Sequence, residues 1–244
     1  SAAQTLPDTA TGGYYWRVTA LASGTPTSSY AVANSGSIAF MVDSSAPTPG
    51  TTSIGTVTAT TTTIGVSGSS DPVSGLATAS YTFVNVTAGT SVGPTSSPTT
   101  TFVGLTPNTP YTFQVTVFDT AGNSSTTLQI TTTTNANTPG TLSLNQDSPT
   151  QLTALWSSNS NPVGTEYWVE NITTTASSGW ITALTYSFPG LTCASSYDVH
   201  VKARGSNGVE TAYGATTTQS TPACLATSTP STGGGIVLFA SPEP

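Results

Sequence analysis

The residues that could carry out catalysis are few in this chain. His200 is the single histidine, and the in-and-out alternation of its segment places it on the outer side of an extended strand. No serine-nucleophile motif, zinc-binding His-Glu-x-x-His motif or phosphate-binding glycine loop occurs. The acidic residues are scattered singly, so no pair of carboxylates is predicted to form a cleft. We therefore expect a protein that is not an enzyme and that has no cofactor.

Three asparagines lie in Asn-x-Ser/Thr sequences, the acceptor pattern for N-linked sugar. Asn85 and Asn171 stand at equivalent places in an internal repeat, and Asn123 lies in a predicted hairpin turn. The equivalent placement favours real acceptors, whereas chance matches are expected in so threonine-rich a chain. All three residues stay candidates for glycosylation.

The same hairpin turn raises the question of a metal ion. Asp119 and Asn123 have oxygen atoms of the kind that calcium prefers. An Asp-x-Ala-Gly-Asn turn, however, uses these residue types for its backbone geometry in any case. Zinc is disfavoured because neither cysteine has another cysteine or a histidine at ligand spacing. No metal site is predicted.

The charge balance excludes one class of partner. Charged residues make up 5% of the chain, against about 25% in ordinary soluble domains, and the net charge is −7 with three Lys and Arg in total. Nucleic acid is excluded as a partner, because phosphate binding needs clustered cations. The longest apolar run, Ile236 to Ala240, is far too short to insert through a membrane. A surface of hydroxyl groups rather than charges is typical of extracellular proteins.

A sequence motif that occurs twice indicates which elements position the candidate functional residues. Gly-Leu-Thr at Gly104 returns at Gly190, 86 residues later. In each copy a tyrosine, Tyr111 or Tyr197, stands six residues after the leucine and opens a strictly alternating segment. This is the pattern of a tyrosine corner in a β-sandwich, where the hydroxyl bonds to the backbone just upstream.

The repeat extends along most of the chain. Thr-Pro-Gly-Thr at Thr48 returns at Thr138, and the segment that begins at Tyr81 returns at Tyr167. A third, partial copy at the N-terminus contains only what would be the last strands of such a unit. Repeats of this kind outrank local propensity as evidence for architecture.

With these residues the chain resembles the fibronectin type III and related immunoglobulin-like modules of bacterial and archaeal surface or secreted proteins. Trp156 stands where this family usually carries the core tryptophan of its second strand, and Val66 takes that place in the preceding repeat. The resemblance implies an all-β fold, a linear array of β-sandwiches. The expected units are a partial sandwich (1–45), a complete sandwich (47–134), a second complete sandwich (137–224) and a Gly-rich linker with an apolar tail strand (225–244).

The resemblance also brings the two cysteines together. Cys193 lies just before the tyrosine-corner Tyr197, and Cys224 lies at the end of the last strand. These positions are close in such a sandwich, so a Cys193–Cys224 disulfide is expected, which would stabilise the domain by about 3–4 kcal/mol. A disulfide implies a compartment outside the reducing cytosol.

One face of the second sandwich has an unusual composition. In this fold the strands that contain Tyr167 and Tyr197 pair, so their outward residues share one face: Glu166, Trp168, Glu170, Asp198, His200, Lys202 and Arg204. The favoured interpretation is cross-strand ion pairing, with Lys or Arg over Trp168. The alternative is a docking interface for a neighbouring subunit or for a glycan.

The sequence favours a non-catalytic extracellular structural protein, the repeating subunit of a prokaryotic surface filament or stalk, with copies of itself as partners. The alternative is an adhesin or a carbohydrate-binding accessory region of a larger secreted protein. A flat, solvent-open pair of rings, such as Trp168 and Trp180, would favour sugar binding. A filament subunit would bury such rings between copies.

The C-terminal tail is a candidate for assembly. Ile236, Val237, Leu238 and Phe239 come after a Gly-rich tether, and a free apolar strand of this kind seeks a sheet edge. Because the N-terminal copy lacks its early strands, we expect the tail of one subunit to complete the partial sandwich of the next. Such a head-to-tail contact gives a fibre when it does not close. The competing explanation is that the chain is a fragment.

Overall fold

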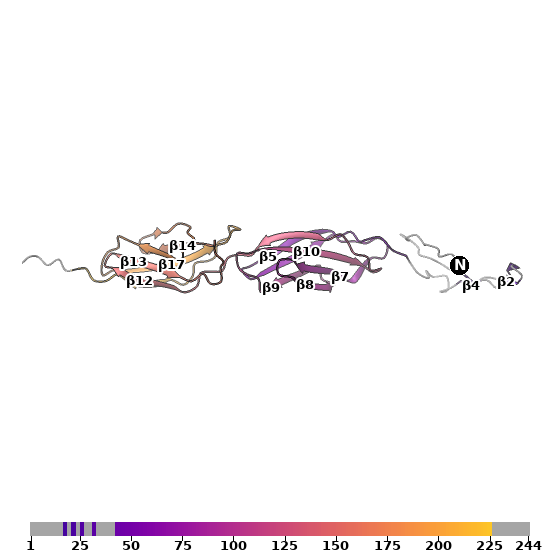
Figure 1. The fold of residues 1–244 in the computed structure, drawn as a ribbon, viewed down its shortest axis with the longest axis horizontal. Helices are drawn as coiled ribbons and strands as arrows, with labels where there is room; N and C mark the ends of the chain where they lie inside the picture. The colour runs from indigo at the N-terminus through magenta and orange to yellow at the C-terminus, as the bar shows by residue number, and fades with distance from the viewer. Residues whose placement is uncertain (1–16, 19–20, 23–24, 27–30, 33–41, 226–244) are drawn as a thin grey trace, which may run out of the picture.

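The computed structural model describes residues 17–18, 21–22, 25–26, 31–32 and 42–225 of the chain. All regular structure in this range is β-strand, and two β-sandwiches are arranged end to end (Figure 1). The predicted fold class, a linear array of β-sandwiches, is confirmed for this part of the chain.

Little of the expected N-terminal partial sandwich falls within the described range. Its backbone is described in four short strands: β1 (Arg17–Val18), β2 (Leu21–Ala22), β3 (Thr25–Pro26) and β4 (Ala31–Val32). Strand β1 pairs with β4 and β2 pairs with β3, both antiparallel. The expected tail strand, residues 236–239, lies wholly outside the described residues.

The first complete sandwich packs a three-stranded sheet on a four-stranded sheet. The smaller sheet has the order β5 (Thr51–Val57), β6 (Thr61–Ser67), β9 (Thr99–Val103). The larger sheet has the order β11 (Leu128–Thr133), β10 (Pro110–Asp119), β7 (Leu76–Asn85), β8 (Thr90–Thr95). All of these strand pairs are antiparallel.

The second sandwich repeats this arrangement strand for strand. Its smaller sheet has the order β12 (Leu142–Ser148), β13 (Gln151–Trp156), β16 (Thr185–Phe188). Its larger sheet has the order β18 (Thr217–Ser220), β17 (Ser196–Arg204), β14 (Glu166–Asn171), β15 (Ala176–Ser177). The repeated sequence phrases therefore correspond to a repeated topology.

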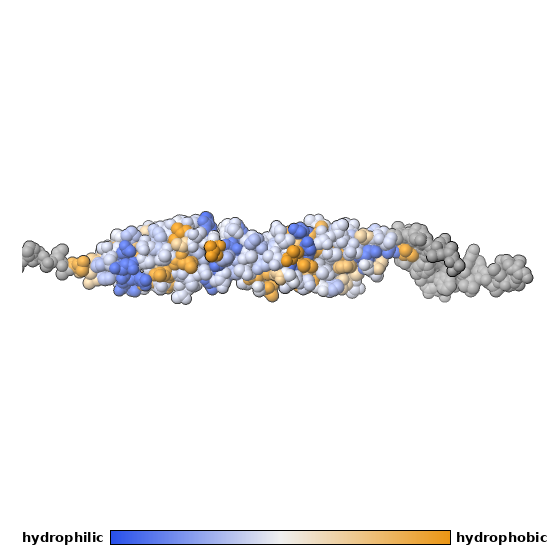
Figure 2. All heavy atoms as spheres, in the orientation of Figure 1, coloured by the Kyte–Doolittle hydropathy of each residue, from blue (hydrophilic) through white to orange (hydrophobic). Residues whose placement is uncertain are grey.

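Alternation of side chains accounts for both cores. In β10 and β17 every second residue is buried, as the sequence pattern predicts for half-buried strands. Trp156 and Val66 occupy equivalent core positions, 5% and 4% exposed. The face seen in Figure 2 is mostly of intermediate hydropathy with scattered apolar and hydrophilic spots, as expected for strand faces rich in threonine.

A tyrosine corner is present in each sandwich. The Tyr111 hydroxyl accepts a hydrogen bond from the Thr106 backbone N–H at 2.8 Å, and the Tyr197 hydroxyl accepts one from the Thr192 N–H at 2.8 Å. The sequence prediction for both corners is thus confirmed. Each bond ties the start of β10 or β17 to the loop that arrives from the opposite sheet.

A buried threonine reinforces each corner, a feature that the sequence analysis missed. The Thr134 hydroxyl donates to the Thr106 carbonyl at 2.7 Å and accepts from the Thr109 N–H at 3.0 Å. The Thr221 hydroxyl donates to the Thr192 carbonyl, also at 2.7 Å. Each threonine lies just after the last strand of its sandwich, so it ties that strand's end to the corner loop.

The disulfide expected from the sequence lies beside the second corner. Cys193 and Cys224 are bonded, with their Cα atoms 5.1 Å apart, within the usual range. The bond joins the corner loop before β17 to the segment after β18. The second sandwich is thus closed at this point by a covalent bond as well as by the Thr221 hydrogen bonds.

The structure argues against glycosylation at all three candidate asparagines. Asn85 and Asn171 are fully buried, and their Oδ1 atoms accept turn hydrogen bonds from the N–H groups of Ala88 and Thr174. A glycan on either Nδ2 does not fit this burial, which weighs against these two candidates. Asn123 is half-buried, and its Nδ2 already donates to the Asp119 carboxylate at 2.7 Å.

Asparagine side chains join the two sandwiches. The Asn108 Nδ2 donates to the Thr165 hydroxyl at 2.9 Å, and its Oδ1 accepts from the Ser206 N–H at 2.7 Å. From the other side, the Asn207 Nδ2 donates to Asn135 Oδ1 at 2.9 Å. Asn108 has a φ of 43°, a conformation that asparagine adopts more readily than most residues. An amide both donates and accepts, which suits it to this polar joint.

The connector between the sandwiches is tied to each of them separately. The Asn135 Nδ2 donates to the Val57 carbonyl, and its backbone N–H donates to the Thr58 carbonyl, both at 3.0 Å. Asn137 forms a reciprocal pair with Asn161, at 2.7 and 2.8 Å. The connector is therefore held along its length by hydrogen bonds, and Pro139 restricts it further because its φ is fixed.

The tyrosine corner can be tested by substitution. Tyr197→Phe leaves the ring in place but removes the partner of the Thr192 N–H, so we expect a loss of about 1–2 kcal/mol in the free energy of unfolding. Tyr186→Phe is the matched control, because its hydroxyl makes only a 3.4 Å hydrogen bond. Urea unfolding monitored by tryptophan fluorescence measures both. Equal losses in the two variants would contradict the corner's role.

Candidate functional site

The register of β14 and β17 gathers the predicted polar residues on one face. The structure places Glu166 opposite Arg204, Trp168 opposite Lys202 and Glu170 opposite His200. The residues between them, such as Tyr167 and Val201, are buried in the core. We call the outward set the charged face: Glu166, Trp168, Glu170, His200, Lys202 and Arg204. All six side chains were predicted to lie on this face.

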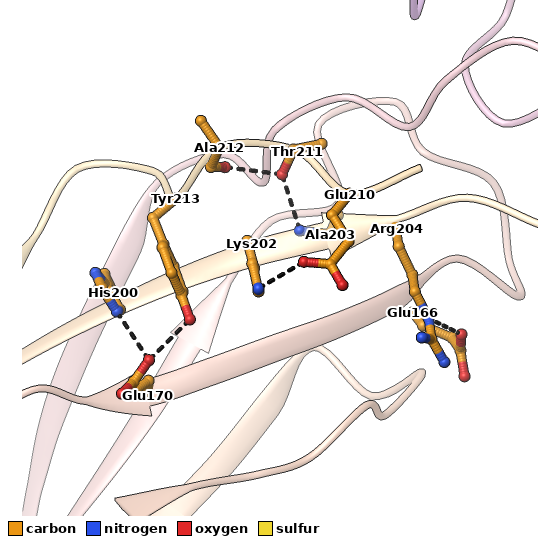
Figure 3. A network of polar contacts seen from close by, with 10 residues as sticks. All are labelled: Glu166, Glu170, His200, Lys202, Ala203, Arg204, Glu210, Thr211, Ala212 and Tyr213. Atoms are coloured by element: carbon orange, nitrogen blue, oxygen red, sulfur yellow. Dashed lines mark hydrogen bonds and ion pairs between the residues drawn. The ribbon is translucent and has the colours of Figure 1, made fainter. Parts of the chain in front are cut away.

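Three ion pairs cross the charged face (Figure 3). The Arg204 Nε donates to the Glu166 carboxylate at 2.6 Å, as its position opposite that residue suggests. His200 Nε2 lies 3.3 Å from the Glu170 carboxylate. Lys202 pairs at 2.6 Å with Glu210, which was not among the predicted residues. Every described side chain that can carry positive charge thus has a carboxylate partner.

The loop between β17 and β18 covers part of the charged face, and the sequence analysis did not foresee this. The Tyr213 ring stacks on His200 with centroids 3.5 Å apart, and its hydroxyl donates to the Glu170 carboxylate at 2.8 Å (Figure 3). Thr211 holds the loop in place, since its hydroxyl accepts from the Ala203 N–H at 3.0 Å. The only cue in the sequence is that Glu210 and Tyr213 stand out among small residues.

Two tryptophans pack edge to face beside the cations of the charged face. The rings of Trp168 and Trp180 have centroids 5.7 Å apart and planes inclined at 61°. The Lys202 ammonium lies 5.9 Å and 5.4 Å from these two rings, and the Arg204 guanidinium lies 4.3 Å from Trp180. Such cation–π contacts stabilise each cation over its ring. The two rings do not form a flat, open platform.

The contacts shift the pKa of two groups in opposite directions. The pKa of Glu170 is lowered, chiefly by the hydrogen bond from Tyr213 and then by that from His200. The pKa of Tyr213 is raised to about 12, first by burial and then by its bond to Glu170. Both shifts favour the state in which Glu170 is ionised and Tyr213 keeps its proton, because that state preserves their hydrogen bond.

The contacts of His200 hold neighbouring side chains of the charged face in place. His200 has one nitrogen against Glu170 and its ring against Tyr213, and no hydroxyl or thiol side chain in the described part of the chain hydrogen-bonds to it. Acyl transfer needs a nucleophile within hydrogen-bond reach of its base. The geometry therefore accounts for His200 as a member of a structural network.

Comparison with known proteins identifies the fold but no sequence family. No family model matches the chain, and no curated protein matches it. The chain is similar in structure to a two-domain fibronectin type III segment of chicken tenascin, with 17% identity, a TM-score of 0.50, and coverage of 71% of this chain and 99% of that segment. Both sandwiches have the fibronectin type III fold.

Further fibronectin type III structures are similar at lower scores. The FN1–FN3 domains of chicken CNTN1 match with 17% identity and a TM-score of 0.35, covering 72% of this chain and 67% of that one. A human fibronectin type III domain matches with 22% identity and a TM-score of 0.34, covering 41% of this chain and 95% of that domain. Separately, no helix among residues 42–225 could cross a membrane.

The Glu170 cluster predicts a pH dependence. The folded-state pKa lies below the ordinary value of 4.5, so the stabilisation is fully present above that pH and is lost as pH falls through the folded value. Between about pH 5 and about pH 3, wild type should therefore lose more stability than Glu170→Gln. Tyr213→Phe removes the largest cause of the pKa shift, so its loss of stability over this pH range should lie between those of wild type and Glu170→Gln. Identical pH profiles in denaturant unfolding would contradict the assignment.

Proposed function

We propose that this chain is a non-catalytic structural protein of the cell exterior, the subunit of a prokaryotic surface filament or stalk. Fibronectin type III-like sandwiches are consistent with a structural or adhesive module. The Cys193–Cys224 bond supports an oxidising compartment. The scarcity of charge suits a surface that packs beside others of its kind.

The observation that carries this proposal is the joint between the sandwiches. Side chains of Asn108 and Asn207 each cross from one sandwich to the other. Asn108 Oδ1 accepts from the Ser206 N–H, and Asn207 Nδ2 donates to the Thr133 carbonyl on β11, over separations of 98 and 74 residues along the chain. Together with the end-to-end arrangement (Figure 1), these bonds support an extended, stiff rod. A flexible linker with no such bonds would instead let the domains reorient freely.

The sugar-binding alternative has less support. An aromatic platform for a sugar ring needs flat, open rings, whereas Trp168 and Trp180 are both half-buried and inclined at 61°. Lys202 and Arg204 lie over them and are themselves paired with Glu210 and Glu166. The charged face is better explained by cross-strand stabilisation than by a glycan site.

Assembly through the tail is also part of the proposal. Residues 236–239 are an apolar run that would add as a strand to the N-terminal unit of the next copy. The support comes from the sequence, since an apolar run at one end of the chain and a partial copy of the repeat at the other would be complementary. Copies joined in this way would extend the rod into a fibre.

Electron microscopy of purified full-length protein tests the assembly. Negative stain should show filaments for wild type and single rods after deletion of residues 236–244, because the deletion removes the donor strand. Trp168→Ala should still assemble, since we assign Trp168 to packing within its own sandwich. Normal filaments from the deletion variant would refute the donor strand. Loss of filaments in a well-folded Trp168→Ala variant would make the charged face the interface.

Stiffness of the joint can be tested independently of assembly in chains that lack residues 236–244, which we expect to be single rods. Asn207→Ala removes a hydrogen bond across the joint, so we expect a broader range of interdomain angles, seen by small-angle X-ray scattering as a shorter mean maximum dimension. Asn145→Ala is the control, an exposed asparagine on β12 away from the joint. Thermal unfolding should be nearly unchanged in both. Scattering curves that superimpose for all three proteins would contradict the role of Asn207.

A further inference from the structure

Three carboxylates meet where the N-terminal segment reaches the first sandwich. Asp43 lies in the connector before β5, Asp71 in the loop between β6 and β7, and Asp119 at the end of β10. Each offers one oxygen, and the three oxygens lie within 4.8 Å of one another. Asp119 is only 2% exposed. Three segments that are distant in the sequence thus bring negative charge to one partly buried point.

Two of these carboxylates have an oxygen that is buried and has no partner. In Asp71, Oδ1 accepts turn hydrogen bonds, for example from the Ser74 N–H at 2.8 Å, and in Asp43, Oδ1 accepts from the Ser45 N–H at 2.9 Å. The Oδ2 atom of each exposes less than 1 Å² and has no hydrogen-bond partner. A buried, unpaired carboxylate oxygen is strongly unfavourable. These two oxygens therefore need a positive partner.

No described side chain supplies that partner. The cationic side chains that the structure describes are His200, Lys202 and Arg204, and each is paired with a glutamate in the second sandwich. Carboxylates this close repel one another, and burial strengthens the repulsion. Asn123 relieves it only in part, since its Nδ2 donates to Asp119 at 2.7 Å and to the Asp43 carbonyl at 3.3 Å.

We propose that Asp43, Asp71 and Asp119 bind a calcium ion. A site made only of oxygen ligands suits a hard cation. Calcium takes six to eight oxygen ligands at about 2.3–2.6 Å in a flexible geometry, whereas magnesium demands a near-ideal octahedron. Three oxygens that all lie within 4.8 Å of one another are close enough to bind one calcium ion. Waters or backbone carbonyls would complete the coordination.

The ion would have a structural effect that goes beyond the proposed filament function. Asp43 belongs to the segment before the first sandwich, whereas Asp71 and Asp119 belong to the sandwich itself. A shared calcium ion would therefore fasten the preceding segment to the sandwich. The second joint is held by asparagine amides, so the two joints of one chain would differ in their dependence on calcium.

Calcium titration of the chain without residues 236–244, which we expect to remain as single rods, tests the proposal. Protein stripped with a chelator is titrated with calcium chloride and monitored by amide NMR. We expect saturable shifts around residues 43, 71 and 119, with an affinity of about 0.1–1 mM, as in other extracellular modules. The second sandwich should not shift. No saturable shift up to about 10 mM calcium would overturn the proposal, as would saturation confined to another region.

Matched variants separate binding from folding. Asp71→Asn keeps an Oδ1 acceptor for its turn but replaces the second oxygen with an amide, so calcium affinity should fall on the order of tenfold or more. Asp43→Asn should do the same, and it lies outside the strands of the sandwich. Asp147→Asn, on β12 of the second sandwich, should bind as wild type. Unchanged affinity in both site variants, or equally tight magnesium binding to wild type, would refute the assignment.

Discussion

A hydrogen bond from a backbone N–H to a tyrosine hydroxyl fixes the crossing between sheets in both sandwiches. Because Tyr111 and Tyr197 are anchored in this way, the residues at which β10 and β17 begin in their sheets are fixed. The residue at which a strand begins determines which of its side chains lie on each face. A shift of one residue in β17 would turn Lys202 toward the core and Val201 toward water. The three ion pairs of the charged face, and the packing of the sandwich beneath them, therefore depend on the corner.

The two-residue period of a strand separates the features that the sequence predicted from those that it missed. The outward residues of β14 and β17 were assigned correctly, because a strand's faces can be counted from one buried tyrosine. Tyr213 and Glu210 were missed because they come from an irregular loop with no period. The same counting would have corrected the glycosylation prediction: Asn171 is an even number of residues from Tyr167, so it faces inward.

Scarcity of charge shapes how this protein is held together. Hydroxyl and amide groups make many of the contacts that ion pairs make elsewhere: Thr134 and Thr221 close the corners, and Asn108 and Asn207 close the joint. Such bonds between neutral groups are less sensitive to salt than surface ion pairs. The charged face of the second sandwich is the exception, and there each described cation has a carboxylate partner.

The position of the disulfide determines how the second sandwich would carry a pulling force. A load applied beyond Cys224 passes directly to Cys193 through the covalent bond, which bypasses the 31-residue sequence separation between them. Strands β17 and β18 lie within that bypassed loop, so tension cannot peel β18 from the sheet edge one hydrogen bond at a time. The bypassed segment also cannot lengthen while the bond is intact. The domain would thus bear tension through its corner, and a reducing environment would remove that protection.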